Sequence, residues 1–377
     1  MVPRRLAAEM RWTFQPAAET FSRYRSFWDE INRANGNHIL LDSAFVGPLL
    51  SHFGSKRILL GLLDRDHGRG AALLRHVRAG AWETFTPSQC PLGLIVLEDD
   101  IEAVEQSHAL LKSLPGYPLS FSVLQQDPLA TAFTDADCVG LAEKMEYIET
   151  PWLAVKGRFA DYWQTRNRNF ARNLARQERR LAEKGITLAL QTIRAPGLVS
   201  DCIARYGAME SNGWKGREGS AVSATNAQGL FYRELLEGFC ERQEGVVYEL
   251  TANGKTIASD LCLERNGSLM ILKTAYDESL NGISPGLLLH KLILQSLFAE
   301  GRIHTVEFCG RMVEWNRKWT NEARRLYHVN VFRHRWVLRA REAVRTVARL
   351  WSGIPMGIGS FGKRPDGRPA AMEDRVA

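Results

Sequence analysis

Two carboxylates and a tyrosine are the side chains of this 377-residue chain best suited to proton transfer. Asp260 stands inside an otherwise apolar run, IASDLCL, where burial would raise the pKa of its carboxyl toward a useful range. Its alternative role is a hydrogen bond between strands. Asp277 follows Tyr276 directly after another apolar run, and it can equally cap a turn. Tyr276 either donates a proton or packs beneath that turn.

The segment that follows has the signals of a helix start. Ser284 is a favoured N-cap residue, and Pro285 suits the first helical position because its missing N–H costs nothing there. Residues 287–299 are apolar on nearly every face, which predicts a largely buried helix. Free N–H groups at a helix start form a ready phosphate site, although any α/β domain contains strand–turn–helix units.

A glycine-rich polar segment, SNGWKGREGSAV, carries Trp214 and Lys215. A lysine in such a loop can neutralise a phosphate on a substrate, and an indole can stack on a sugar. The alternative is a surface loop anchored by a buried tryptophan. Both residues are therefore candidates for substrate binding.

Composition limits the classes of protein that this chain can be. Hydrophobic residues make up 45% and charged residues 24%, as in soluble globular proteins. No apolar run approaches a membrane span, and the N-terminus lacks the hydrophobic core of a secretion signal, so we expect a cytoplasmic protein. Six scattered cysteines and nine histidines form no metal motif, so we expect reduced thiols and no metal. The net charge of +7 favours acidic partners.

Helical and strand-like segments alternate along the chain and predict two α/β units. We expect the first over residues 1–150 and the second over 151–335, followed by a basic amphipathic helix and a disordered tail over 336–377. In the first unit, the patterns predict helices at 17–34, 38–50 and 101–114, and strands at 57–63, 82–91 and 120–124.

The second unit contains a predicted meander of antiparallel strands. Asn253-Gly254 and Asn266-Gly267 are strong hairpin signals between strands expected at 246–250, 256–264 and 268–274. After the buried helix, further strands are expected at 304–309 and 326–332. The strand before the phosphate-binding turn is thus the last of the meander.

Two segments are strongly basic. The segment from Lys156 to Lys184 contains nine basic and three acidic residues. The segment from Arg311 to Arg349 contains eleven basic and three acidic residues. The first predicts a solvated helix surface or a site for an acidic ligand or an anionic membrane. The helix from residue 335 can dock on its own domain, bind a partner or lie on a membrane surface.

Several short motifs follow one another in a recognisable order: Trp214-Lys215-Gly216, Gly219-Ser220-Ala221, Phe231-Tyr232, Tyr276-Asp277-Glu278, Ser284-Pro285-Gly286, Phe308, Gly310 and Trp319. Together with the order of elements, they resemble the GNAT acyltransferases. The residues of these motifs resemble one branch of that superfamily, the CelD or BcsL-like acetyltransferases of cellulose and exopolysaccharide production. The resemblance covers most of residues 10–335, and the YDE…SPG segment is its most specific part.

The resemblance implies an α/β (α+β) fold with tandem GNAT-like domains, each a mixed, mostly antiparallel sheet flanked by helices. The first would be degenerate, similar in plan to the Fem aminoacyltransferases. The donor would be an acyl-CoA or an acyl carrier protein, with its pyrophosphate on the N–H groups of Gly286, Leu287 and Leu288. Trp315-Asn316 stands where the family often has a Tyr-Lys pair, which leaves Tyr276 as the nearest replacement for a general acid.

The implied activity is N-acylation of an amino sugar or another envelope or polysaccharide precursor. The base, acting directly or through water, would be Asp260 or Asp277. Expected partners are the glycan-precursor acceptor, an acyl carrier protein and a peripheral inner-membrane contact, without DNA. The alternatives are Fem-like transfer from aminoacyl-tRNA, which the basic helix near 161–184 would suit, and a non-catalytic, membrane-associated factor of polysaccharide synthesis.

Overall fold

The computed structural model describes residues 11–63, 68–78, 80–98, 103–130, 133, 140–212, 222–280 and 282–352. The chain divides into two compact units. The first comprises Met1–Asn37, Lys56–Ile148 and Arg325–Ala377, and the second comprises His38–Ser55 and Glu149–Arg324. Segments from both ends of the chain thus enter the first unit, while domain boundaries at 150 and 335 stay a prediction. The predicted disordered tail, 353–377, lies outside the described residues.

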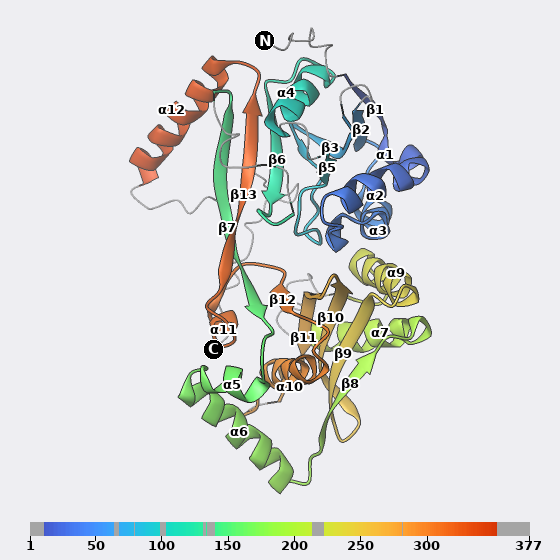
Figure 1. Cartoon of the computed structure of the whole chain (residues 1–377), viewed down its shortest axis with the longest axis vertical. Coiled ribbons are helices and arrows are strands. Elements are labelled where there is room, and N and C mark those ends of the chain that lie inside the picture. Colours follow the sequence, from blue (N-terminus) through green and yellow to red (C-terminus); the bar gives the residue numbers. More distant parts are fainter. Residues whose placement is uncertain are drawn as a thin grey trace. The chain divides into compact units, whose positions relative to one another are not determined.

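The first unit is built on one mixed sheet (Figure 1). Its order is β1-β2-β3-β4-β6-β13, and β5 pairs with β3. The pair β4 and β6 is parallel, and its neighbours in that order pair antiparallel. The strands are β1 (Trp12–Pro16), β2 (Leu59–Leu63), β3 (Gly70–Arg78), β4 (Ala81–Thr84), β5 (Ile95–Leu97), β6 (Ser120–Gln126) and β13 (Ala323–Phe332). The helices are α1 (Ala17–Thr20), η1 (Phe21–Tyr24), α2 (Arg25–Ala34), α4 (Ala103–Ser113) and α12 (Arg335–Ser352).

The second unit has a sheet of the order β7-β12-β11-β10-β9-β8. Here β11 and β12 run parallel, and the other neighbouring pairs run antiparallel. The strands are β7 (Ala142–Ala154), β8 (Leu188–Ile193), β9 (Gly245–Ala252), β10 (Lys255–Arg265), β11 (Ser268–Tyr276) and β12 (Thr305–Phe308). The helices are η2 (Ile39–Leu41), α3 (Ser43–Phe53), α5 (Phe159–Gln164), α6 (Arg168–Glu183), α7 (Pro196–Asn212), α9 (Ala227–Glu241), α10 (Pro285–Glu300) and α11 (Glu314–Arg317). The division between units falls within β7 and β13.

The same strand order occurs twice. In each unit an antiparallel run ends in a parallel pair, and a helix joins the members of that pair: α4 lies between β4 and β6, and α10 lies between β11 and β12. In each, a strand from elsewhere in the chain completes the order, β13 in the first and β7 in the second. The predicted α/β fold with mostly antiparallel sheets and flanking helices is confirmed.

The meander of β9, β10 and β11 forms where the hairpin signals predicted it. Asn253 and Gly254 have φ angles of 48° and 82°, and Asn266 and Gly267 have 51° and 73°. Two successive residues with positive φ give the turn whose twist matches that of antiparallel strands, and Asn-Gly is the pair that best tolerates this. The hairpin predictions are confirmed.

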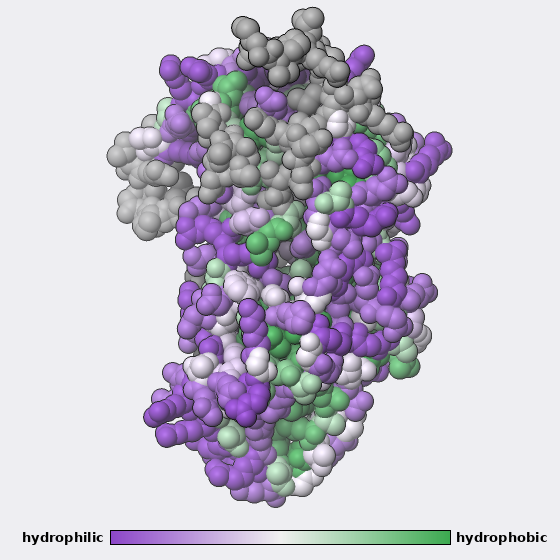
Figure 2. Space-filling view, viewed as in Figure 1, coloured by the Kyte–Doolittle hydropathy of each residue, from purple (hydrophilic) through white to green (hydrophobic). Residues whose placement is uncertain are grey.

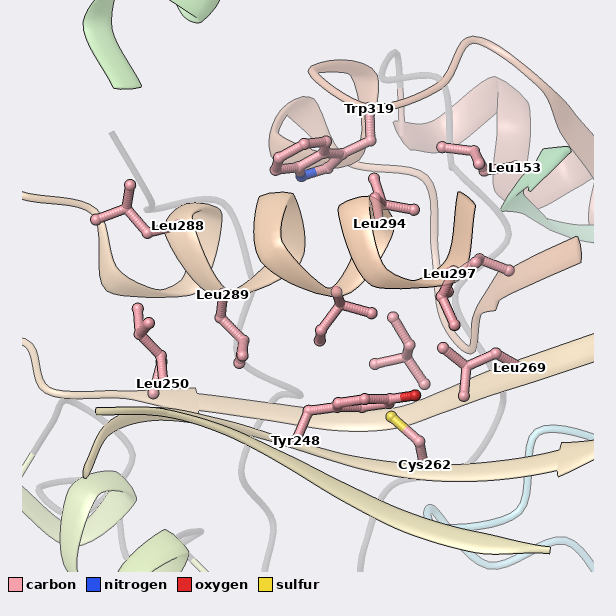
Figure 3. Close-up of a cluster of buried hydrophobic side chains, with 14 of the residues drawn as sticks. Leu153, Tyr248, Leu250, Cys262, Leu269, Leu288, Leu289, Leu294, Leu297 and Trp319 are labelled. Atoms are coloured by element: carbon pink, nitrogen blue, oxygen red, sulfur yellow. The ribbon is translucent and has the colours of Figure 1, made fainter. Parts of the chain in front are cut away.

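The core of the second unit lies between α10 and the meander (Figure 3). Leu289 and Leu297 of α10 point toward the strands that carry Tyr248 and Leu250, while Trp319 covers the helix from the opposite side. The fully buried Leu289, Leu297 and Trp319 confirm that this helix is largely buried. Burying side chains of this size contributes about 1.5–3 kcal/mol each, so α10 is fixed firmly on the sheet.

Helix α12 docks on its own unit through arginines. Arg345 and Arg341 both pair with Glu143, in the part of β7 that belongs to the first unit, and the Arg341 guanidinium lies 5.4 Å from the ring centroid of Phe332. Trp336, near the start of this helix, is 59% exposed. Of the three alternatives for this helix, docking on its own unit is therefore the one that its arginine face adopts.

Candidate active site

The pairing between the parallel strands β11 and β12 ends halfway along β11. Their register runs from Ser268 opposite Thr305 to Ile271 opposite Phe308, whereas β11 continues to Tyr276. The register between β10 and β11 also shifts at Leu261/Cys262, so β11 bulges just where its pairing with β12 ends. A bulge bends a strand and is often found beside active sites. We call residues 272–276, which have no β12 residue in register, the strand divergence.

The start of α10 is open to an anion. Ser284 occupies the N-cap position, but no side-chain cap bond is found there in the described residues. Its backbone N–H donates to Gln177 of α6 at 2.8 Å, and the Gln177 amide lies 3.5 Å from the Ser284 hydroxyl. The prediction that Ser284 is the N-cap residue is confirmed, but its hydroxyl lies toward α6 and makes no cap bond with the described residues of the helix.

The N–H groups at this helix start differ in what they already bind. Leu288 donates its N–H to the Ser284 carbonyl at 3.0 Å, which is the first bond of the helix. Its assignment to phosphate binding is thus corrected. Gly286 and Leu287 follow Pro285 in the first turn, where N–H groups have no acceptor within the helix. These two N–H groups are the ones suited to a phosphate.

Tyr276 joins the strand divergence to the helix start. A Cβ atom added at Gly286 would lie 3.3 Å from Cδ1 of Tyr276, so the tyrosine ring packs directly against this glycine. Burial, with a smaller contribution from Glu278, raises the pKa of Tyr276 above its usual value. The hydroxyl therefore keeps its proton at neutral pH, although its role as a proton donor stays a prediction.

Asp277 makes the contacts of a turn residue. Its carboxylate accepts hydrogen bonds from the Ser279 N–H at 3.0 Å and from the Ser279 hydroxyl, and it lies 3.5 Å from Lys255 Nζ. The hydrogen bond from the Ser279 hydroxyl is the main cause that lowers the pKa of Asp277, and Lys255 adds to it. Both Ser279 bonds lie within the turn itself, so these contacts favour the turn-capping alternative.

Asp260 faces α10 and is closed off from solvent. Its Oδ2 lies 2.9 Å from Nε2 of His290, and the two side chains are 0% and 4% exposed. The His290 ring stacks on Trp315, with centroids 5.3 Å apart, and Phe308 and Trp319 lie edge-on to it. Asp260 thus pairs with a helix rather than with a neighbouring strand. An acceptor cannot reach it in this arrangement.

The opposite face of the sheet carries an ion pair that the sequence patterns did not single out. Lys273 of β11 places its Nζ 3.2 Å from Oε1 of Glu210, near the end of α7. A lysine inside the apolar run LMILKTAY was the available signal. Trp214 and Lys215, the predicted substrate-binding residues, lie outside the described residues.

In the first unit, the position that corresponds to the strand divergence is filled. The β4–β6 register covers 81–83, and Thr84 Oγ1 accepts the Leu124 N–H at 3.0 Å where β4 ends. Gly93 lies so close to this point that a Cβ there would be 2.1 Å from the Leu124 carbonyl oxygen. The open arrangement therefore belongs to the second unit.

The comparison with family models decides the type of this second unit. Residues 168–317 match the model described as the acetyltransferase (GNAT) domain. This chain carries a GNAT acetyltransferase domain. The matched range contains the strand divergence, the start of α10 and the Glu210–Lys273 pair. The chain accordingly contains a transferase domain of the GNAT type over residues 168–317.

Solved structures share this fold at low sequence identity. FemX is 9% identical with a TM-score of 0.53, and the similarity covers 84% of this chain and 98% of FemX. A C-terminal domain from Agrobacterium fabrum, assigned to a lysylphosphatidylglycerol synthetase, is 12% identical with a TM-score of 0.51, covering 90% and 99%. A protein of unknown function from Bacteroides thetaiotaomicron is 12% identical with a TM-score of 0.52, covering 84% and 99%. At these identities the likeness establishes the fold and no more.

No curated protein matches this chain. Within the described ranges, no group of three or more His, Cys, Asp or Glu side chains could hold a metal ion. In the same part of the chain, every helix is too short or too polar to cross a membrane.

Proposed function

We propose that this chain is an N-acyltransferase that moves an acyl group from a thioester to an amine. The observation that carries the proposal is the strand divergence at residues 272–276, with the uncapped start of α10 beside it. The edge of β11 offers backbone groups to an extended pantetheine arm, and Gly286 and Leu287 offer N–H groups to its phosphates. One ligand shape, an extended arm ending in phosphate, fits both features.

The reaction requires a short sequence of bond changes. The amine nitrogen attacks the thioester carbonyl, the carbon–sulfur bond breaks, and the nitrogen loses one proton while the thiolate leaves. Oxyanion stabilisation by fixed donors lowers the barrier to the tetrahedral intermediate. Tyr276, with its raised pKa, stays protonated near the divergence and is our candidate to protonate the leaving sulfur.

The donor we propose is acyl-CoA or an acyl carrier protein. Helix α6 is joined to the start of α10 through Gln177 and Ser284. Its solvent-facing side is hydrophilic in Figure 2 and carries the exposed cations Arg168, Arg172, Arg176, Arg179, Arg180 and Lys184. Such a surface attracts a phosphorylated or acidic donor. It supports both donors, so they are separated by experiment.

The acceptor we propose is an amino sugar or another envelope or polysaccharide precursor. The support is the resemblance of the motifs Tyr276-Asp277-Glu278 and Ser284-Pro285-Gly286 to the CelD-like branch. The exposed basic side of α6 also suits a second candidate function, Fem-like transfer of an amino acid from tRNA. The non-catalytic alternative is attachment to anionic lipid, and the exposed Trp336 beside basic residues of α12 supports the peripheral membrane contact.

The test is transfer from acetyl-CoA and from an acetylated acyl carrier protein to glucosamine, followed by thiol release. Thiol release that depends on glucosamine supports the proposal, and the preferred donor decides between the two. If neither donor shifts the unfolding temperature or reacts, the thioester proposal fails. Tight, salt-sensitive tRNA binding would then favour the Fem-like function. Co-sedimentation with anionic liposomes, with and without residues 334–377, tests the membrane contact separately.

A further inference from the structure

We infer that Glu210 and Lys273 form the acceptor-side catalytic pair of this domain, with Glu210 taking the proton from the attacking amine and Lys273 facing the oxyanion. The inference rests on the proposed function and names the residues that would carry its chemistry. Lys273 belongs to β11, whose edge would hold the thioester, but its side chain contacts Glu210 of α7 and not the start of α10.

The pair lies at the strand divergence. Lys273 is two positions beyond Ile271, the last β11 residue in register with β12, and its Nζ lies 3.2 Å and 3.5 Å from the two Glu210 carboxylate oxygens. The Glu210 carboxylate also accepts the Val222 N–H at 2.6 Å. These hydrogen bonds fix the carboxylate where a thioester carbonyl in the divergence would meet its acceptor.

The pair also faces the correct side of the sheet. Lys273 contacts α7, whereas Asp260, on the adjacent strand β10, contacts His290 of α10. Helix α10 covers its own face and places its N–H groups there for the donor phosphates. An acceptor must then approach the acyl carbon from the α7 face, where Glu210 and Lys273 lie.

The pair is more buried than a surface ion pair, as is typical of a functional site. The Glu210 side chain is 5% exposed and that of Lys273 is 20% exposed. Tyr206, one turn earlier on α7, is fully buried, and burial together with the neighbouring Glu210 carboxylate raises the pKa of its hydroxyl well above the usual value. Burying charges and hydroxyls costs free energy, so such a cluster is expected where charge separation is needed.

The charges of the pair match those that the reaction creates. Attack by an amine on a thioester gives a tetrahedral intermediate with a positive nitrogen and a negative oxygen. The Glu210 carboxylate accepts the proton from that nitrogen, and the Lys273 ammonium stabilises that oxygen. When the carbon–sulfur bond breaks, the electron pair leaves with sulfur as the thiolate, and the proton passes from Glu210 to solvent.

A matched control stands on the same face of the sheet. Glu249 of β9 accepts hydrogen bonds from Arg205 of α7 at 3.0 Å and 3.1 Å, and its side chain is 3% exposed. The Glu249 carboxylate is as buried as that of Glu210, but it lies on a strand that does not border the divergence. Glu249→Gln therefore reproduces the structural cost of Glu210→Gln without touching the reacting atoms.

The experiment compares glucosamine with hydroxylamine, which is already unprotonated at neutral pH, as acceptors of acetyl-CoA. We expect Glu210→Gln to lower kcat/KM for glucosamine by at least about 100-fold. The same variant should react with hydroxylamine nearly as fast as the wild type, because the nitrogen of the hydroxylamine adduct is acidic enough to lose its proton to water without a base. Lys273→Met should slow both acceptors by about 100-fold or more. Glu249→Gln should change neither, and the KM for acetyl-CoA should stay constant throughout.

Two results overturn the inference. Equal losses with both acceptors in Glu210→Gln would mean a structural role, and so would matching losses in Glu249→Gln at a matched unfolding temperature. Full glucosamine activity in Glu210→Gln would exclude the residue from proton transfer. A wild-type chain that acylates neither amine counts instead against the proposed function, so the two failures are distinguishable.

Discussion

Gly286 lies against the ring of Tyr276, with 3.3 Å between the ring carbon Cδ1 and the position that a Cβ would take. The contact joins the last residue of β11 to the first turn of α10. Any side chain at position 286 must displace the ring or turn away toward the N–H groups of the helix start. The glycine therefore keeps the proposed phosphate position open.

A first prediction concerns this glycine. Gly286→Glu places a carboxylate beside the N–H groups of the first turn, where it competes with a donor phosphate and repels it. We expect KM for acetyl-CoA to rise at least about tenfold, since helix-terminus interactions of this kind contribute about 1–2 kcal/mol. Initial-rate kinetics measure this. Gly286→Ala, which adds the Cβ without charge, is the control, and equal KM values for the two variants would contradict the electrostatic explanation.

A second prediction separates Asp277 from the proton-transfer chemistry. The Asp277 carboxylate is occupied within its own turn, where it accepts hydrogen bonds from the N–H and the hydroxyl of Ser279. Asn at this position still accepts the Ser279 N–H, so the turn is retained. We expect Asp277→Asn to keep kcat within about threefold of the wild type, because a missing base would cost about 100-fold or more. A loss of that larger size would return Asp277 to the list of bases.

The second unit could be predicted largely from local sequence signals. The Asn-Gly pairs at 253–254 and 266–267 fix the hairpins through positive φ angles, which few other residues adopt readily. Helix α10 was predicted from Pro285 and the apolar run after it. These features depend on residues that are neighbours in the sequence, so they can be predicted from the sequence alone.

The features that were not predicted depend on contacts between residues that are distant in the sequence. Strand β13 joins β6 of the first unit, with Val331 opposite Phe121, and no local pattern signals that pairing. Strand β3 was missed because its first half is buried without alternation and its second half is exposed. The 17–34 helix is interrupted by the 3₁₀ turn Phe21–Tyr24.

The candidate site shows the same limit. Lys273 and Glu210 are 63 residues apart in sequence, and each alone looks like an ordinary charged residue. Asp260 was singled out correctly as a buried carboxylate, but its partner His290 lies on a helix 30 residues later. Burial was predictable from the surrounding apolar residues, whereas the direction of the side chain was not.

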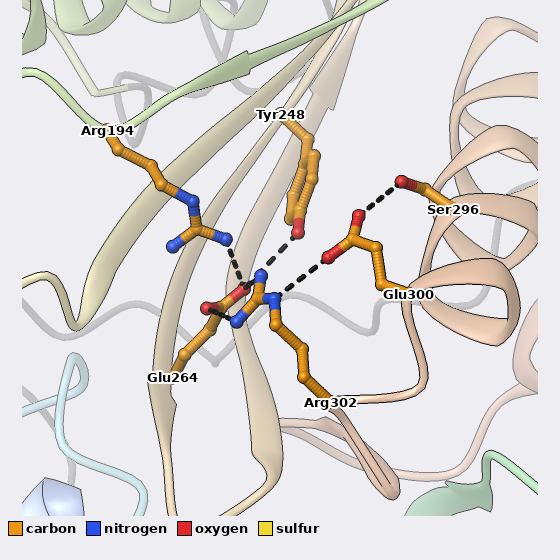
Figure 4. Close-up of polar contacts among 6 residues, drawn as sticks. All are labelled: Arg194, Tyr248, Glu264, Ser296, Glu300 and Arg302. Carbon is orange, nitrogen blue, oxygen red and sulfur yellow. Dashed lines mark hydrogen bonds and ion pairs between the residues drawn. The ribbon is translucent and has the colours of Figure 1, made fainter.

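A third prediction concerns stability in acid. Glu264 is bonded to Arg194 at 2.8 Å and to Arg302, and the Tyr248 hydroxyl lies 3.3 Å away (Figure 4). Burial alone would raise the pKa of Glu264, but the hydrogen bonds and charges of Arg302 and Arg194 outweigh it and lower the pKa. Because the pKa is lower in the folded state, the carboxylate stabilises that state at pH values above its unfolded-state pKa of about 4.3. This stability is lost as the pH falls through the folded-state pKa.

Glu264→Gln should therefore lower the free energy of unfolding by about 3 kcal/mol at neutral pH, since it leaves two arginines beside a neutral group. The difference from the wild type should shrink toward about pH 3 as the wild-type carboxyl is protonated. Urea unfolding at both pH values measures it. The control is Glu300→Gln, which removes the more exposed partner of Arg302 and should cost less than about 1 kcal/mol. A difference independent of pH would contradict this account.

A fourth prediction assigns Asp260 and His290 a positioning role. Their side chains meet at 2.9 Å beneath α10, which places the helix start relative to β11. Removing one partner leaves a buried polar group unpaired, so Asp260→Leu and His290→Phe should each lower the free energy of unfolding by about 3–5 kcal/mol. The double variant should be less destabilised than the sum of the two by about 1–3 kcal/mol, because both buried groups are then absent. Chemical unfolding of the four proteins completes the cycle.

In Asp260→Asn, which keeps the side-chain size, KM for acetyl-CoA should rise while the pH profile of kcat stays unchanged. A shifted pH profile would instead make Asp260 the base, since a residue that acts through the position of α10 cannot move the ionisation that limits the chemical step.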